Sequence, residues 1–132
     1  LELMGLQGAV EEMVRLYNAA HGDCHFQFSA IGDFSQLNSD IAISAYRIVQ
    51  EATSNILKHA QASQVEIELE LDAKAHRLSI TITDNGHGFD PQQVAAGIGI
   101  SGMRERVLVL DGEFSLRSQI GDGTQIAISI PV

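Results

Sequence analysis

Residues 65–72 read Val-Glu-Ile-Glu-Leu-Glu-Leu-Asp, a strict alternation of apolar and acidic side chains. Successive side chains of a β-strand point to opposite faces of its sheet, so this run predicts a half-buried strand with an acidic outer face. After a turn at residues 73–76, the alternation resumes over residues 78–83 as Leu-Ser-Ile-Thr-Ile-Thr. A hairpin is the simplest interpretation, and it supplies the antiparallel centre of a predicted sheet.

Helical spacing appears on both sides of this hairpin. Residues 41–59 carry an apolar stripe at three- and four-residue steps, and Asn38, Ser39 or Asp40 can cap its start. A second helix is predicted over residues 1–22, with Gly22 as a left-handed stop. Its apolar positions are Leu3, Leu6, Val10, Met13, Leu16 and Tyr17.

The remaining segments complete a two-layer architecture. Residues 25–31 predict a short strand through Phe26, Phe28 and Ile31. Residues 101–110 have helical spacing, with Gly112 as their stop, and strands are predicted near residues 114–116 and 126–130. We therefore predict an α+β fold, a two-layer α/β sandwich. Its sheet is mixed and mostly antiparallel, and helices cover one face.

Composition narrows the classes of function. The chain has 132 residues and 8 Lys and Arg against 17 Asp and Glu, a formal charge of -9. This deficit of positive charge argues against nucleic acid as a partner, because phosphate backbones are held mainly by Lys and Arg. No apolar run approaches the roughly 20 residues of a membrane-spanning helix. Cys24 is the only cysteine, which excludes an internal disulfide and disfavours a zinc site. We expect a soluble, cytoplasmic, single-domain chain.

A glycine-rich segment follows the hairpin, and residues 97–102 read Gly-Ile-Gly-Ile-Ser-Gly. Such glycines let backbone N–H groups approach phosphate oxygens, and the helix that starts near Ser101 points its N-terminus at them. The alternative is a flexible loop before a helix. A dinucleotide-binding Rossmann unit is disfavoured, because that fingerprint follows a buried parallel strand and opens a βαβ unit.

Asp84-Asn85-Gly86-His87-Gly88 follows the second strand of the hairpin. A carboxylate that projects from a strand end into a pocket can accept a hydrogen bond from an exocyclic amine such as that of adenine. The two glycines let the backbone turn close to the base. The alternative is a simple turn, for which Asp-Asn-Gly is common chemistry.

One edge of the predicted 41–59 helix collects polar groups. Glu51 lies four residues before Asn55, and Lys58 and His59 lie three and four residues after it. An amide oxygen is a hard ligand suited to Mg²⁺, and the two basic groups can neutralise phosphate charge. The alternative is a solvated face with Lys and His near a helix C-terminus. Thr124, in the sequence Gly-Asp-Gly-Thr, also has two interpretations: its hydroxyl contacts a ligand or the water bound to it, or the segment is a simple turn.

In combination, these motifs resemble a known family. A Glu-x-x-x-Asn helix, then DxGxG, GxGxxG and GxGT, in this order between Ile41 and Val132, resembles the ATP-binding domain of the histidine-kinase, gyrase, heat-shock-chaperone and mismatch-repair ATPases. That resemblance implies a Bergerat-type ATP-binding fold with ATP and Mg²⁺ as cofactors. Residues 46–60 and 97–106, with the short segment 89–97 between motifs, look like the sensor kinases of the nitrate- and hexose-phosphate-sensing branch.

The resemblance also implies roles for single residues. Asn55 would hold the Mg²⁺ that bridges the ATP phosphates, and would be catalytic in that sense. Asp84 would accept the adenine amine, aided by Gly86 and Gly88, while Thr124 would support the adenine through water.

Further residues would lie around the triphosphate. Lys58 and His59 would lie near the phosphates. Glu51 matches the acidic position four before Asn; ATPases use it to activate water, whereas a kinase would use it to polarise the incoming nucleophile. The glycine-rich segment would form a lid and contribute Gly97, Gly99, Ile100, Gly102 and Met103.

The phosphoacceptor of such kinases is a His in a separate dimerisation helix, usually followed directly by Asp or Glu. None of the five His residues here has that neighbour. We therefore expect an excised catalytic domain, monomeric and unable to phosphorylate itself. Residues 1–22 would be the end of a linker plus a first helix, and residues 23–132 the catalytic domain. Its expected partners are ATP and ADP, the dimerisation and phosphoacceptor domain of its parent kinase, and a response regulator. The parent kinase is expected to be either free in the cytoplasm or anchored in the inner membrane.

Two other functions are compatible with the same motifs. A serine kinase of the anti-sigma-factor type shares this fold and would phosphorylate a protein Ser. A nucleotide-gated interaction module would bind ATP and change shape without catalysis. A dehydrogenase would instead bind NAD and need no Mg²⁺.

Overall fold

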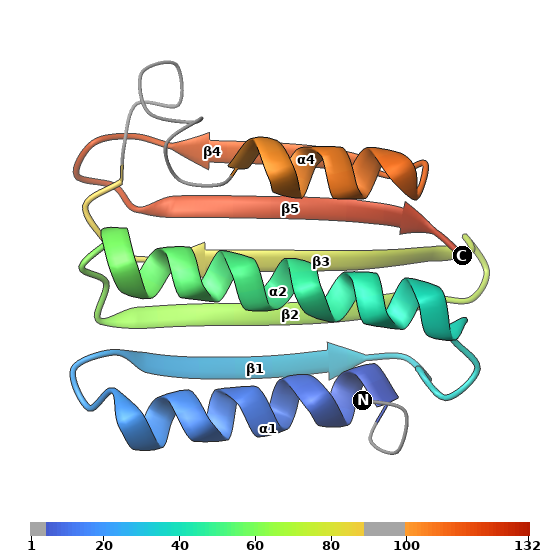
Figure 1. Cartoon of the computed structure of the whole chain (residues 1–132), viewed down its shortest axis with the longest axis horizontal. Coiled ribbons are helices and arrows are strands. Elements are labelled where there is room, and N and C mark those ends of the chain that lie inside the picture. Colours follow the sequence, from blue (N-terminus) through green and yellow to red (C-terminus); the bar gives the residue numbers. More distant parts are fainter. Residues whose placement is uncertain (1–4, 89–99) are drawn as a thin grey trace.

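The computed structural model of the chain describes residues 5–88 and 100–132. A five-stranded sheet forms one layer and helices pack on one of its faces (Figure 1). The elements, in chain order, are α1 (Gly5–Ala20), β1 (His25–Ile31), α2 (Ser39–His59), β2 (Gln64–Asp72), β3 (Arg77–Asp84), α4 (Ile100–Val109), β4 (Glu113–Ser118) and β5 (Thr124–Pro131).

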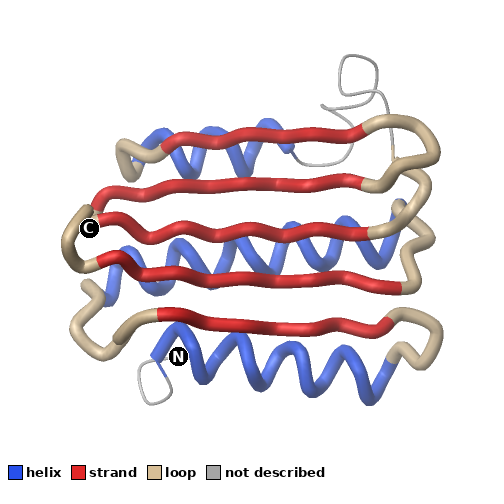
Figure 2. The backbone as a smooth tube through the Cα atoms, turned by 180° about the vertical axis from the view of Figure 1, so that it is seen from behind, coloured by secondary structure: helices blue, strands red, loops and turns tan. Residues whose placement is uncertain are grey.

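The sheet has the strand order β1-β2-β3-β5-β4. β1 and β2 are parallel and are joined through α2, whereas every other neighbouring pair is antiparallel. The predicted hairpin is confirmed, with Val65 opposite Asp84 and Asp72 opposite Arg77. The opposite view shows the other face of the sheet, which no described helix covers (Figure 2). The predicted fold class is confirmed.

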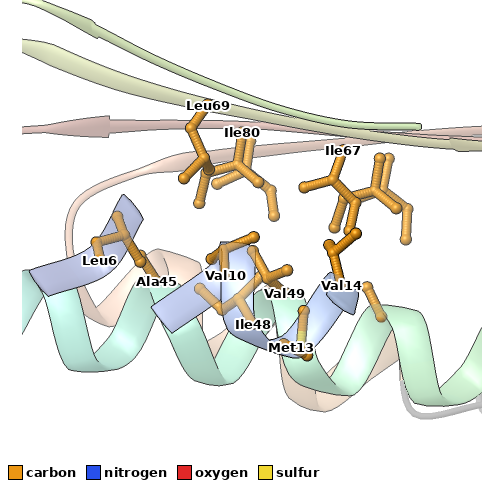
Figure 3. Packing of buried hydrophobic residues seen from close by; sticks show 14 of the residues in the cluster. Leu6, Val10, Met13, Val14, Ala45, Ile48, Val49, Ile67, Leu69 and Ile80 are labelled. Atoms are coloured by element: carbon orange, nitrogen blue, oxygen red, sulfur yellow. The ribbon is translucent and has the colours of Figure 1, made fainter. Parts of the chain in front are cut away.

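The core lies between the two layers. Alternate residues of the strands point toward the helices, and Ile67, Leu69 and Ile80 meet side chains from α1 and α2 there (Figure 3). Removing these apolar side chains from water is the main force that joins the layers. α1 shares this core, because Leu6 and Val10 are fully buried in it. No helix in the described ranges is long and apolar enough to cross a membrane.

Two details differ from the expectations of the sequence, and one of the three predicted alternatives for the cap of α2 is confirmed. Leu16 is 51% exposed and Ile31 is 64% exposed, because the faces of α1 and β1 that carry them point away from the core. Gly22 has no positive φ, and α1 already ends at Ala20. The cap of α2 is Asn38, whose side-chain oxygen accepts hydrogen bonds from the backbone N–H groups of the first turn.

The end of α4 also differs. Asp111, not Gly112, has the left-handed conformation, with φ +59°. Asp111 N–H donates to the Leu108 carbonyl and Gly112 N–H to the Val107 carbonyl, each at 3.0 Å. This is a Schellman arrangement, in which the last carbonyls of the helix gain donors. Gly112 is required for a different reason, because a Cβ there would lie 2.8 Å from the Ser129 carbonyl oxygen.

Candidate functional site

Asp84 is a carboxylate in a position that the strand pattern reserves for apolar side chains. It ends β3, two residues after Ile82, on the face that packs against the helices. Its side chain is only 5% exposed, and one carboxylate oxygen accepts a hydrogen bond from the Gly86 backbone N–H at 2.8 Å. Burial raises the pKa of Asp84, and the Gly86 N–H, the charge of His87 and the Thr124 backbone oppose that shift.

A short polar row crosses the sheet at this end. Thr124 of β5 pairs with Asp84 on one side and with Ser118 of β4 on the other. The hydroxyls of Thr124 and Ser118 lie 2.9 Å apart, within hydrogen-bond distance. The site therefore contains Ser118, which the sequence interpretation missed. The signal for Ser118 is its register opposite Thr124, and strand pairing is not visible in the sequence.

The loop after Asp84 is packed tightly against two other parts of the chain. A Cβ on Gly86 would overlap the Ala60 carbonyl oxygen, and the same oxygen accepts a hydrogen bond from His87 N–H at 2.9 Å. Gly88 has φ +65°, and a Cβ there would overlap the Gln119 carbonyl oxygen. The loop thus contacts the C-terminus of α2 and the β4–β5 turn through backbone, which explains both glycines in the folded chain.

Asn85 fixes this loop from the other side. Its side-chain oxygen accepts hydrogen bonds from the backbone N–H groups of Ser63 and Gln64, both at 2.9 Å. Its side-chain nitrogen donates to the Ser63 hydroxyl at 2.9 Å. The sequence interpretation treated Asn85 only as part of a turn, because its partners lie more than 20 residues away. Asn85 therefore positions Asp84, because it links the loop after β3 to the segment that leads into β2.

Two hollows lie near these residues. One, of about 610 Å³, lies at the strand ends and includes Asp84, Ser118 and Thr124 in its lining. The other, which we name the α2 hollow, has a volume of about 430 Å³ and lies over α2. Its lining includes Glu51, Asn55, Lys58, Arg47 and Arg106. The position where Gly102 lacks a Cβ is 3.9 Å from the Glu51 carboxylate, so the first turn of α4 faces Glu51.

The C-terminal end of α2 lies between the two hollows. Ala60, just beyond α2, touches the loop after Asp84, and Asn55 precedes Ala60 by five residues. Five residues of helix span about 7.5 Å, so Asn55 lies about that far along α2 from the contact with the loop. Asp84 lines the hollow at the strand ends, and Asn55 and Glu51 line the hollow over α2.

The other predicted site residues are partly outside the described part of the chain. Gly97 and Gly99 lie outside the described residues, as do the side chains of Ile100 and His59. Lys58 is exposed at the edge of the α2 hollow. Met103 is a core residue with 1% exposure.

The donor set suits a divalent cation that arrives with a nucleotide. The described residues contain no group of three or more His, Cys, Asp or Glu side chains that could hold a metal by themselves. Mg²⁺ commonly keeps water and takes only one or two protein oxygens when phosphates supply the rest. The amide oxygen of Asn55, half-buried in the α2 hollow, fits that role.

The sequence profile of the histidine kinase-, DNA gyrase B- and HSP90-like ATPases matches residues 40–132, most of the chain. The chain belongs to this ATPase family. Over its full length it is 35% identical to the signal transduction histidine-protein kinase/phosphatase DegS of Brevibacillus brevis and 30% identical to DegS of Bacillus subtilis. It spans only about a third of each relative, 34% and 35% of their lengths.

Solved structures agree on the fold. The histidine kinase domain of the blue-light activated kinase of Erythrobacter litoralis has a TM-score of 0.74 and 21% identity, over 96% of this chain and 65% of that one. The histidine kinase AdeS of Acinetobacter baumannii has a TM-score of 0.70 and 14% identity, over 97% of this chain and 65% of that one. The chain therefore has the fold of a histidine kinase ATPase domain.

The buried charge of Asp84 predicts a stability effect of its own. The pKa is raised above its ordinary value of 3.8, so the folded chain binds a proton more readily than the unfolded chain. The free energy of unfolding should therefore fall as the pH rises from about that value through the raised pKa. Asp84→Asn removes this titration, and we expect it to unfold at higher urea concentration than the wild type at pH 7, with a smaller difference at pH 4. An Asn variant that is less stable at pH 7 would contradict this prediction.

Gly123 and Gly121 form a matched pair for testing the tight packing at the site. Both have positive φ, +78° and +91°, but only a Cβ on Gly123 would overlap the Asp84 carbonyl oxygen. We expect Gly121→Ala to cost about 1–2 kcal/mol from backbone strain. Gly123→Ala should cost at least about 1 kcal/mol more, because the Asp84 backbone must also move. Urea unfolding of both variants measures the difference, and equal losses would show that the close approach is unimportant.

Proposed function

We propose that this domain binds Mg²⁺–ATP and donates the γ-phosphoryl group to a histidine on a separate domain. The observation that carries the proposal is Asp84, a carboxylate buried at a core position beside a hollow. Burying a carboxylate destabilises the fold, as its raised pKa indicates, so a ligand that uses the acceptor accounts for its presence. The exocyclic amine of adenine is a donor of the required kind.

In the proposed complex the nucleotide lies along the path from Asp84 to Asn55. Adenine donates its amine hydrogen bond to Asp84, and the Thr124 hydroxyl supports the base through water. Gly86 and Gly88 hold the loop of Asp84 in place through their backbone contacts. Asn55 would hold Mg²⁺, which supplies neutralisation of the phosphate charge when bound. Lys58 and His59 would add positive charge near the phosphates.

Glu51 is the proposed polarising residue for the acceptor. It lies one helical turn before Asn55 in the same hollow. A carboxylate there can accept a hydrogen bond from one imidazole nitrogen and so make the other more nucleophilic. That nitrogen attacks the γ-phosphorus, a nitrogen–phosphorus bond forms, and the bond to the bridging oxygen breaks to leave ADP. Positioning and charge stabilisation supply most of the catalysis in such transfers.

The wider context is part of the same proposal. Phosphate would pass from the histidine to an Asp of a response regulator, and residues 23–132 would form the catalytic unit, with residues 1–22 leading in from the dimerisation region. The DegS relatives are named as signal transduction kinase/phosphatases, which supports a two-component role. Membership of the nitrate- and hexose-phosphate-sensing branch stays a prediction.

A transfer experiment tests the proposal. The rest of the Brevibacillus brevis DegS, without the stretch that this chain matches, serves as acceptor, and γ-labelled ATP is the donor. We expect label on the acceptor that is stable to alkali and labile to acid, as a phosphohistidine is, and only when this chain and Mg²⁺ are both present. Label on a serine would favour the anti-sigma-factor type of kinase, and ATP binding without any transfer would favour a nucleotide-gated module.

A further inference from the structure

The last row of side chains across β3, β5 and β4 differs in kind from the row before it. On the face that packs against the helices, the inner row is apolar and consists of Ile82, Ile126 and Leu116. One step nearer the strand ends, the same strands carry Asp84, Thr124 and Ser118. Figure 1 shows these ends on the same side of the sheet. A complete row thus becomes polar where the sheet meets the hollow of about 610 Å³, which we name the strand-end hollow.

The contacts of the Ser118 hydroxyl define its direction. It lies 3.2 Å from the Gly123 carbonyl oxygen and 2.9 Å from the Thr124 hydroxyl. A carbonyl oxygen can only accept a hydrogen bond, so Ser118 donates its proton to Gly123. Because a hydroxyl has a single proton, Ser118 must accept in its contact with Thr124. The hydrogen bonds therefore run from Thr124 through Ser118 to the Gly123 carbonyl.

This chain of hydrogen bonds commits the proton of Thr124 to a partner within the protein. The lone pair that remains on the Thr124 oxygen can only accept. Thr124 lines the strand-end hollow together with Asp84, and the two residues are opposite each other in the pairing of β3 with β5. The ionised carboxylate of Asp84 is also an acceptor only. The hollow therefore presents two neighbouring acceptors, which favours a ligand that brings two protons to them.

We propose that Ser118 is a positioning residue that helps to select a base with an exocyclic amine, because it keeps Thr124 an acceptor toward the ligand. Such an amine has two protons on one nitrogen. One can be donated to Asp84 and the other to Thr124, directly or through water. An oxo group in the same place has no proton to donate. This inference deepens the proposed function and rests on it, since it takes adenine as the base that Asp84 binds.

Loss of the Ser118 hydroxyl would reverse the direction of the Thr124 hydrogen bond. The Thr124 proton could then turn into the strand-end hollow, where it would face a proton of the amine, and two donors cannot satisfy each other. The effect is specific to the amine of the nucleotide. If Ser118 only closed the turn between β4 and β5, its loss would weaken every nucleotide alike.

The test compares two ligands that differ only in this amine. They are ATP and purine riboside triphosphate, which has a hydrogen in place of the 6-amino group. Calorimetry with Mg²⁺ measures both affinities for the wild-type chain, Ser118→Ala, Ser118→Thr and the matched control Ser115→Ala. Ser115 lies on the same strand, but it is exposed and pairs with Ala127. The ratio of the two affinities is taken within each protein, so a general loss of affinity cancels.

We expect the wild-type chain to bind ATP at least about tenfold more tightly than purine riboside triphosphate. Ser118→Ala should reduce this ratio by about threefold to tenfold, which corresponds to one neutral hydrogen bond. Ser118→Thr keeps the hydroxyl and should keep the ratio, as should Ser115→Ala. If urea unfolding shows that Ser118→Ala does not fold, Ser118→Cys replaces it, because a thiol is similar in shape but a weak donor and acceptor.

Thr124→Val removes the hydroxyl whose direction Ser118 sets. We expect the same reduced ratio in this variant, and no further reduction when Ser118→Ala is added. A ratio that Ser118→Ala leaves unchanged, or that falls again in the double variant, would overturn the inference and leave the proposed function standing. A wild-type chain that binds neither nucleotide would contradict the proposed function and, with it, this inference.

Discussion

Replacing Asp84 with Asn is expected to weaken ATP binding by about 10- to 150-fold, the equivalent of about 1.5–3 kcal/mol for one charge-assisted hydrogen bond. The physical reason lies in the contacts of the carboxylate. One oxygen accepts the Gly86 N–H, and an Asn oxygen would keep that bond. The amide nitrogen of Asn would then replace the second oxygen and present a donor to the adenine amine, which is itself a donor.

The control for this variant is Asp72→Asn. Asp72 also accepts a hydrogen bond from the backbone N–H two residues later, at 3.0 Å from Lys74, but it is exposed at the far end of the hairpin. Calorimetry with ATP should show full affinity for Asp72→Asn and the large loss for Asp84→Asn. Because Asp84→Asn is expected to gain stability, a loss of affinity cannot be attributed to unfolding. An affinity within twofold of the wild type would refute the adenine assignment.

Asn55→Ala is expected to reduce Mg²⁺-dependent phosphoryl transfer by at least about 100-fold, or about 2.7 kcal/mol in the activation barrier. The side chain is half-buried in the α2 hollow, so the fold should tolerate its truncation. Without the amide oxygen, the cation that accompanies the phosphates would lose its ligand from the protein.

A second substitution at the same position separates the ligand role from other contacts of Asn55. Asn55→Asp keeps a hard oxygen and should recover part of the transfer activity that Asn55→Ala loses. Thermal unfolding of both variants checks the fold, and the acceptor assay with γ-labelled ATP measures transfer. Full activity of Asn55→Ala would show that the cation is held elsewhere.

Much of the fold was predictable because its strands alternate so regularly. The pairing of β2 with β3 follows from two apolar-polar repeats on either side of a short turn. The same alternation carries the strongest sign of the site. Continuing the core positions Leu78, Ile80 and Ile82 by one more step reaches Asp84, a charge where an apolar residue belongs.

Contacts between distant segments were not predictable in the same way. Ser118 joins the site through its strand register, and Asn85 through hydrogen bonds to the start of β2. The sequence predicted that Gly86 and Gly88 let the backbone turn, but not that Gly86 is needed because Ala60 lies against it. Such close approaches depend on how the layers pack, which local propensity does not contain.

Calorimetric titration of the 132-residue chain with a non-hydrolysable ATP analogue tests the central claim most directly. The titrations are made with and without Mg²⁺, with NAD as the competing ligand and Asp84→Asn as the variant. We predict binding of the ATP analogue that depends on Mg²⁺ and on Asp84, and no binding of NAD. A folded chain that binds NAD as well as ATP, or that binds neither, would contradict the account.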